Sequence, residues 1–221
     1  AQDKKRGKIF TKIIKEITIS ARLGGGEISS NPRLRKAVSN AKSNNLPADK
    51  IQRAIKKGTG ELEGVLYEEV TYEGYGPGGV AIIMDIITDN KNRSVAEIRH
   101  ILSVYSGNLG ENGSVSWMFN KRGLIILDST SDNEDIVFGA TIDAGAEDFQ
   151  LGEDIYLIST GKDNLMEVRD SLEDLGYDVK SAEIDMVPEV TQKCNEKESN
   201  LVLKLLEALE DNDDVQNIFS N

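Results

Sequence analysis

The chain of 221 residues has little of what secreted, membrane-embedded and metal-dependent proteins rely on. It contains a single cysteine, Cys194, so an internal disulfide is impossible, which is typical of a reducing compartment. No apolar run approaches the roughly 18–20 residues that span a bilayer, and no signal-peptide pattern opens the chain. We therefore expect a cytoplasmic protein, or one of the mitochondrial matrix if the source is a eukaryote, without a membrane partner.

Signals of catalysis and metal binding are equally scarce. His100 is the only histidine, and a lone base needs a nucleophile beside it, so a structural role is favoured. Cys194 lies in a polar stretch without a nearby histidine, and no Cys/His metal spacing occurs. The acidic run at 211–214 lacks the Gly and the later Glu of a calcium loop. The sequence predicts a protein that is not an enzyme, with no catalytic residue, metal, cofactor or small-molecule substrate.

Positive charge is concentrated at one end of the chain. The formal net charge is −12, but residues 1–60 carry 15 Lys and Arg against four acids, a net of +11. Residues 61–221 therefore carry a net of −23. Such a basic segment is typical of contact with a polyanion, whereas an ordinary solvated surface mixes both signs. The alternative is a Lys-rich helical surface with no ligand.

The basic segment is predicted to form three helices. In the first, Ile13, Ile17 and their neighbours recur at helical spacing, and the lysines fall on the other side. Gly24–Gly26 stops this helix, and Asn31 caps the second, whose first position is proline. The third begins near Pro47 and is expected to end at Gly58. So small a unit buries little apolar area, and we expect its stability to depend on packing against the rest of the chain.

The candidate nucleic-acid-binding residues are the basic side chains that fall outside the predicted apolar faces of these helices. One interpretation is a helix-turn-helix that reads a major groove of DNA. The basic segment has almost no aromatic residue on which bases could stack, so contact with phosphates is better supported. The candidates are Lys4, Lys5, Lys8, Lys12, Lys15, Arg22, Arg33, Arg35, Lys42, Lys50, Arg53 and Lys57.

Beyond residue 63 the pattern changes to strands. Segments 66–75 and 80–88 are predicted strands joined by a Gly-Pro-Gly-Gly turn, followed by a helix from Ser94, its expected cap, and a strand at 114–119. Trp117 is most simply a core or domain-interface residue. Segment 123–188 then follows the order βαββαβ of ferredoxin-like folds. The final helix and strand have no partners of their own, so they are expected to complete the first sheet.

The predicted fold class is therefore α+β, with an N-terminal three-helix domain and two α/β domains, of which the ferredoxin-like one is inserted in the other. The expected boundaries are 1–62 for the basic helical domain, 63–122 with 189–221 for the first α/β domain, and 123–188 for the insertion.

Long motifs in the chain resemble the YebC/PmpR family. They are NPRLRKAVSNAKSNNLPADKIQRAIKKG at 31–58, YEGYGPGGVAII at 72–83, TDNKNRS at 88–94, GSVSWMF at 113–119 and AGAED at 144–148. The resemblance extends over essentially the whole chain, and the fold it implies is three domains, one of them inserted in another.

The resemblance implies a role in gene expression. Bacterial members are described as DNA-binding transcriptional regulators, and mitochondrial relatives are translational activators of a cytochrome oxidase subunit. The implied partner is thus nucleic acid. A DNA-binding transcriptional regulator is the first expectation, and the alternative is a ribosome-associated translation factor that contacts rRNA; a scaffold with no nucleic-acid role is a third. The residues themselves predict binding to phosphate groups, but they do not identify the polymer.

Overall fold

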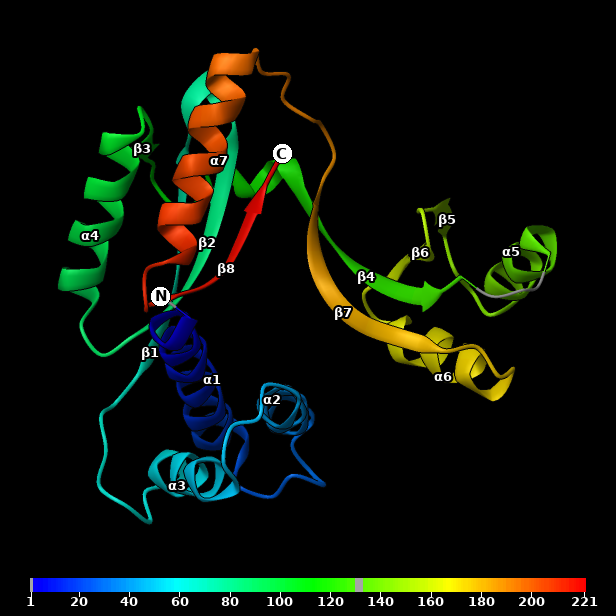
Figure 1. Cartoon of the computed structure of the whole chain (residues 1–221), viewed down its shortest axis with the longest axis horizontal. Helices are drawn as coiled ribbons and strands as arrows, with labels where there is room; N and C mark the ends of the chain where they lie inside the picture. The colour runs from blue at the N-terminus through cyan, green and yellow to red at the C-terminus, as the bar shows by residue number, and fades with distance from the viewer. Residues whose placement is uncertain (1, 130–132) are drawn as a thin grey trace. The chain divides into compact units, whose positions relative to one another are not determined.

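The computed structural model describes residues 2–129 and 133–221 and divides the chain into two compact units (Figure 1). The first unit comprises residues 1–116 and 192–221, and the second comprises 117–191. The first unit contains α1 (Gln2–Gly24), α2 (Pro32–Ser43), α3 (Ala48–Thr59), β1 (Glu68–Tyr75), the 3-10 turn η1 (Pro77–Gly79), β2 (Ala81–Thr88), α4 (Lys91–Val104), β3 (Asn108–Leu109), α7 (Glu196–Glu210) and β8 (Val215–Ser220). The helical head therefore shares a unit with the first sheet.

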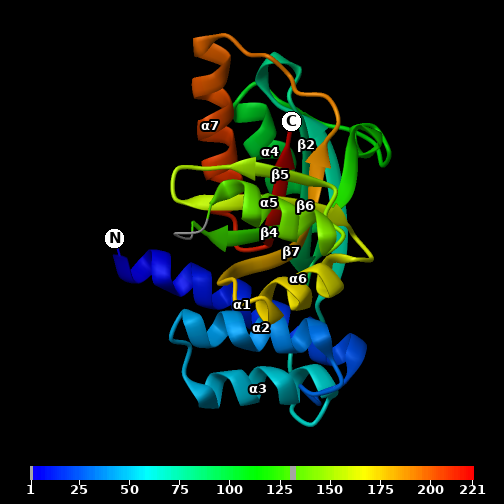
Figure 2. The same cartoon turned by 90° about the vertical axis from the view of Figure 1, so that its right-hand side faces the viewer.

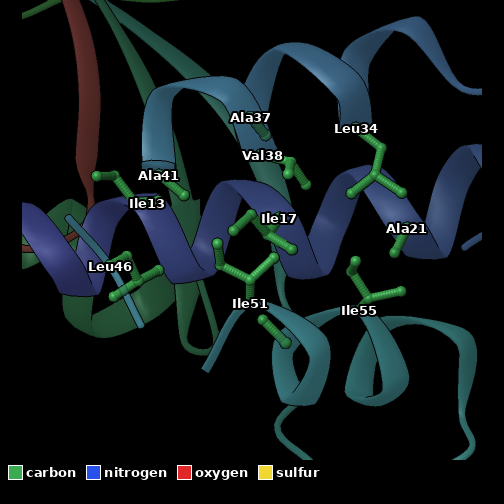
Figure 3. Packing of buried hydrophobic residues seen from close by; sticks show 11 residues of the cluster. Ile13, Ile17, Ala21, Leu34, Ala37, Val38, Ala41, Leu46, Ile51 and Ile55 are labelled. Carbon is green, nitrogen blue, oxygen red and sulfur yellow. The ribbon is translucent and has the colours of Figure 1, made fainter. Parts of the chain in front are cut away.

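The head, residues 2–60, is built around α1. Figure 3 shows Ile13 and Ile17 of α1 between Val38 of α2 on one side and Ile51 and Ile55 of α3 on the other. Ile17 is fully buried, as the helical spacing of the apolar residues predicts. Both shorter helices pack on α1, which makes the longest helix the centre of this core.

The ends of the helices follow the expected chemistry with one exception. Gly25 has a positive φ of 87° after α1, and the side chain of Asn31 caps α2 by accepting from the Leu34 amide. Gly58, however, does not end α3, because the helix continues to Thr59 and Gly60 takes the left-handed cap. A Cβ atom on Gly58 would lie 2.3 Å from the backbone oxygen of Thr18 in α1. This glycine is thus required for the close approach of two helices.

The first sheet has the strand order β3-β1-β2-β8, with every neighbouring pair antiparallel. Residues of β2 such as Ile82 and Met84 share a buried core with Leu102 of α4 and Leu205 of α7. The last helix and strand thus complete the first sheet, as predicted. The turn between β1 and β2 also agrees, because Gly78 has a positive φ of 69°.

Two local predictions about this unit were wrong. Asn90, not Ser94, caps α4, and Ser94 is buried with its hydroxyl on Thr88. Segment 114–119 is not one strand: residues Ser116–Met118 form the 3-10 turn η2, and the strand begins at Phe119. The competing interaction is Glu73, a buried carboxylate that accepts the backbone N–H groups of 113, 115 and 116 and holds that segment in a turn.

Hydrogen bonds decide the charge state of this buried carboxylate. Burial raises the pKa of the Glu73 carboxyl, but the backbone N–H groups of Gly113, Ser116 and Val115 outweigh that effect and hold its pKa below the ordinary value. Glu73 therefore remains ionised while it closes the loop.

The second unit has the ferredoxin-like arrangement predicted for the insertion. Its elements are η2, β4 (Phe119–Asp128), α5 (Glu134–Asp143), β5 (Asp148–Leu151), β6 (Ile155–Gly161), α6 (Leu165–Asp174) and β7 (Val179–Pro188). The strand order is β5-β6-β4-β7, all antiparallel, and α5 and α6 cover one face of this sheet (Figure 2). The α+β class with an N-terminal helical region and two sheet regions is thereby confirmed. Among the described residues, no helix is long and apolar enough to span a membrane.

Replacement of Gly58 by alanine is expected to destabilise the first unit by about 1–3 kcal/mol, because the new methyl group overlaps the backbone of α1. The same change at Gly7, which has open space within 4 Å, should be neutral or stabilise by up to about 1 kcal/mol, since alanine favours the helix. Hydrogen exchange of the α1 and β2 amides measures both effects. Equal stability of the two variants would contradict the close approach.

Candidate nucleic-acid interface

Three lysines of α1 contact an acidic turn of the same chain, residues 210–214. Lys8 forms an ion pair with Asp211 at 2.6 Å and donates to the backbone oxygen of the same residue at 2.8 Å. Lys12, one turn later, donates to the backbone oxygen of Glu210. Both acceptors lie where α7 ends and the chain turns into β8, beside the first half of α1 (Figure 1). This part of the predicted basic stripe therefore faces carboxylates and helix-terminal carbonyls, not solvent alone.

Lys15 is buried, with only 6% of its surface exposed, so it does not belong to an exposed phosphate-binding surface. Its ammonium group lies 2.5 Å from Oδ1 of Asp214 and also donates to the backbone oxygens of Asp213 and Ile87. The prediction for Lys15 is corrected because a buried ammonium group needs a full set of acceptors, and β2 and the acidic turn supply them.

Asp214 is shared between the head and the first sheet. Its second oxygen accepts from Arg93 at 3.0 Å and from the hydroxyl of Ser94 at 2.6 Å, both on α4. Burial raises the pKa of the Asp214 carboxyl, but the hydrogen bonds from Lys15, Ser94 and Arg93 outweigh it and hold the pKa below its ordinary value. One carboxylate thus connects α1, α4 and the start of β8.

Three of the predicted arginines also have partners within the first unit. Arg33 pairs with Glu16 at 2.7 Å and with Glu69, so its charge is compensated. Arg22 donates to the backbone oxygen of Tyr67 at 2.7 Å, and Arg35 donates to those of residues 28 and 29. Carbonyl groups do not neutralise a cation, so Arg22 and Arg35, both exposed, keep their positive charge at the surface.

The remaining candidates lie in solvent. They are Lys4 and Lys5 near the start of α1, Lys42 on α2, and Lys50, Arg53 and Lys57 on α3. None of these six forms an ion pair with a carboxylate in the part of the chain that the structure describes. Lys56, which was not among the predicted residues, is exposed on α3 in the same way.

The exposed residues of α3 form one cationic side, which we call the α3 basic face and define as Lys50, Arg53 and Lys57. Their spacing of i, i+3 and i+7 places them on one side of the helix. Lys50 lies 6.0 Å from the ring centre of Phe10, and Arg6 lies 5.2 Å from the same ring, so this face continues onto α1. At its other end, Lys57 lines a groove together with Arg22. Cations from three sequence regions are thus brought to this side of the head.

Sequence reasoning missed the internal partners of the basic head. No motif marks the acidic run at 211–214 or Arg93 as a partner of the basic head. The available signal was charge: Lys8, Lys12 and Lys15 lie on the side of α1 away from its apolar residues, and a dense acidic run follows the last helix. No group of His, Cys, Asp and Glu suited to a metal ion occurs among the described residues. Trp117, predicted to be a core or domain-interface residue, is 68% exposed in the structure.

A basic three-helix head on an acidic sheet unit with an inserted ferredoxin-like unit defines a class of three-part α+β proteins. Family models match both parts of this arrangement: the N-terminal domain of TACO1/YebC proteins over residues 1–61, and the second and third domains of TACO1/YebC over residues 67–221. The chain belongs to the TACO1/YebC family, which confirms the resemblance inferred from its motifs.

The relatives extend over the whole chain. A protein of Syntrophus aciditrophicus is 54% identical, and one of Geotalea uraniireducens is 52% identical; each match covers all of this chain and 89% of the relative. Both bear the name "probable transcriptional regulatory protein". The crystal structure of a conserved hypothetical protein from Aquifex aeolicus is 45% identical with a TM-score of 0.86, covering 98% of this chain and 90% of that one. The names describe the first two relatives as regulators.

Substitution of Asp214 by asparagine is expected to destabilise the first unit by about 3 kcal/mol, because it leaves the buried Lys15 without its counter-charge. Hydrogen exchange of the α1 and β2 amides reports this destabilisation. Asp213→Asn is the matched control, since that side chain is exposed and only its backbone oxygen accepts from Lys15. An effect of the same size in both variants would mean that the Asp214 ion pair does not hold α1 in place.

Lowering the pH should remove the stabilisation that the Asp214 carboxylate gives the first unit. The folded-state pKa of Asp214 is depressed, so its stabilisation is complete above the unfolded value of about 3.9 and is lost as the pH falls through the lower folded value. In urea unfolding followed by circular dichroism, wild type and Asp214→Asn should differ fully at about pH 6 and converge below about pH 4. A difference that stays constant down to about pH 2 would exclude this linkage.

Proposed function

We propose that the chain is a nucleic-acid-binding regulator of gene expression that holds duplex DNA through the phosphates, without catalysis. The observation that carries the proposal is the α3 basic face with Lys42 and the cations near the start of α1, which are exposed and have no carboxylate partner in the described part of the chain. The names of the relatives support the same role. Arg and Lys in this exposed form suit phosphate contacts.

The proposal divides the sequence candidates into two groups. Lys4, Lys5, Lys42 and the α3 basic face contact phosphate, and Arg22 and Arg35 flank them with exposed charge. Lys8, Lys12, Lys15 and Arg33 instead hold the head to the first sheet, Arg33 through Glu69 of β1. Binding is therefore expected to respond strongly to changes in the first group. Changes in the second group should act mainly through stability.

Ribosomal RNA is the second candidate target, because the exposed cations recognise phosphate, which DNA and RNA share. A translation factor of this kind would use the same face. The two functions differ in which polymer binds more tightly at equal length and salt, so one titration with both polymers separates them.

Replacement of the three residues of the α3 basic face by glutamine is expected to weaken binding of a fluorescein-labelled duplex of about 20 base pairs roughly 10- to 100-fold at about 0.15 M salt. The log–log salt slope should fall by about 0.9 for each phosphate that the variant no longer neutralises. The measurement is fluorescence anisotropy over a range of salt concentrations, repeated with an RNA hairpin of equal length.

The control variant removes the same charge elsewhere. Lys193, Lys197 and Lys204 are exposed lysines of the first unit outside the head, and their replacement by glutamine should leave affinity within about twofold. Equal weakening in both triple variants would reduce the effect to net charge and reject the face. Binding of the RNA hairpin more than about tenfold tighter than the duplex would favour the translational function.

A further inference from the structure

Helix α5 of the inserted unit carries apolar side chains that are partly exposed among the described residues. Val137 is fully buried against the sheet, but Phe138 and Ile142 are 48% and 41% exposed and lie one turn apart on the same flank. Ile136, on the opposite flank, is 61% exposed. A helix that is apolar all round is ordinarily buried all round, so exposed flanks of this composition indicate a surface that another molecule covers.

The apolar surface continues onto the edge of the sheet. The ring of Phe138 meets that of Phe149 edge-on, with 5.7 Å between the centroids, and Phe149 belongs to the edge strand β5. Leu151, two residues later, lies on the same side of this strand and is 55% exposed. We call Phe138, Ile142, Phe149 and Leu151 the α5–β5 patch. Figure 2 shows the two elements that carry it.

Exposed acids lie on the same elements as this patch. The residues Glu134, Asp135, Asp143, Asp148, Glu153 and Asp154 all lie on α5, on β5 or in the turn after it, and all are exposed. None of the six forms an ion pair in the range that the structure describes, whereas Glu147 pairs with Arg122, and Asp128 with Lys180. The unit as a whole carries five Lys and Arg against 18 acids, a net of −13.

We propose that the α5–β5 patch is a docking surface for a basic protein segment, whose apolar side chains pack on Phe138, Ile142 and Leu151 while its Lys and Arg residues face the surrounding acids. Charge complementarity selects this occupant. Nucleic acid and anionic lipid would be repelled by the same acids, and a second copy docked through the same patch would bring two acidic rims together. The inserted unit thus binds protein through residues that do not belong to the head.

The experiment places a photo-crosslinking benzoylphenylalanine at position 138 of the full chain in cells and maps the crosslinked peptides by mass spectrometry. The expected product is a peptide of another protein in which Lys and Arg outnumber Asp and Glu. Its yield should fall at least about fivefold when Ile142→Asp and Leu151→Asp are added, since charge then replaces apolar contact area. Because both side chains are exposed, these changes should leave the fold intact, which thermal melting checks.

The control places the same group at Leu203 of α7, an apolar residue outside the inserted unit that is 64% exposed. Products at position 138 no more abundant than at this control would overturn the proposal. So would crosslinks to the chain itself, to lipid, to nucleic acid, or to peptides without excess basic residues. A yield unchanged by the two aspartates in a folded variant would place the contact outside the patch and reject it as well.

Discussion

Asp214 lies buried where the helical head meets the first sheet, and Lys15, Arg93 and Ser94 all donate to its carboxylate. A buried charge is tolerated only with a full set of partners, so the position of each donor is constrained by the others. The three donors come from α1 and α4, while the acceptor precedes β8. The small head, which buries little apolar area by itself, is fixed to the sheet through this polar centre.

The same interaction divides the positive charge of the head between two tasks. Carboxylates and backbone carbonyl groups accept hydrogen bonds from Lys8, Lys12 and Lys15, which keeps these cations at the contact with the acidic turn. The cations of the α3 basic face have no such partner in the described residues, and they remain available to phosphate. The +11 charge of residues 1–60 therefore overstates the positive charge that the head exposes without a carboxylate partner.

Negative charge is distributed just as unevenly. In the first unit two acids serve the fold, because Asp214 and Glu73 are buried and hydrogen-bonded. In the inserted unit most acids are exposed, and those around α5 lie beside an apolar surface without ion pairs in the described range. The two surfaces favour opposite partners, since a cationic face attracts phosphate and an acidic apolar one attracts a basic protein.

Local interactions determined much of this protein from sequence alone. The spacing of apolar residues predicted the helices of the head, and Asn31 was correctly predicted to cap α2. The alternation of strands and helices predicted the inserted βαββαβ unit, and the motifs identified the family. Tertiary structure decided what spacing does not encode. Gly58 looked like a helix end because its contact with Thr18 is remote in sequence, and Lys15 looked like a surface residue because Asp214, 199 positions away, neutralises it. Helical periodicity reports which residues share a side of a helix, and only packing decides whether that side meets solvent or another part of the chain.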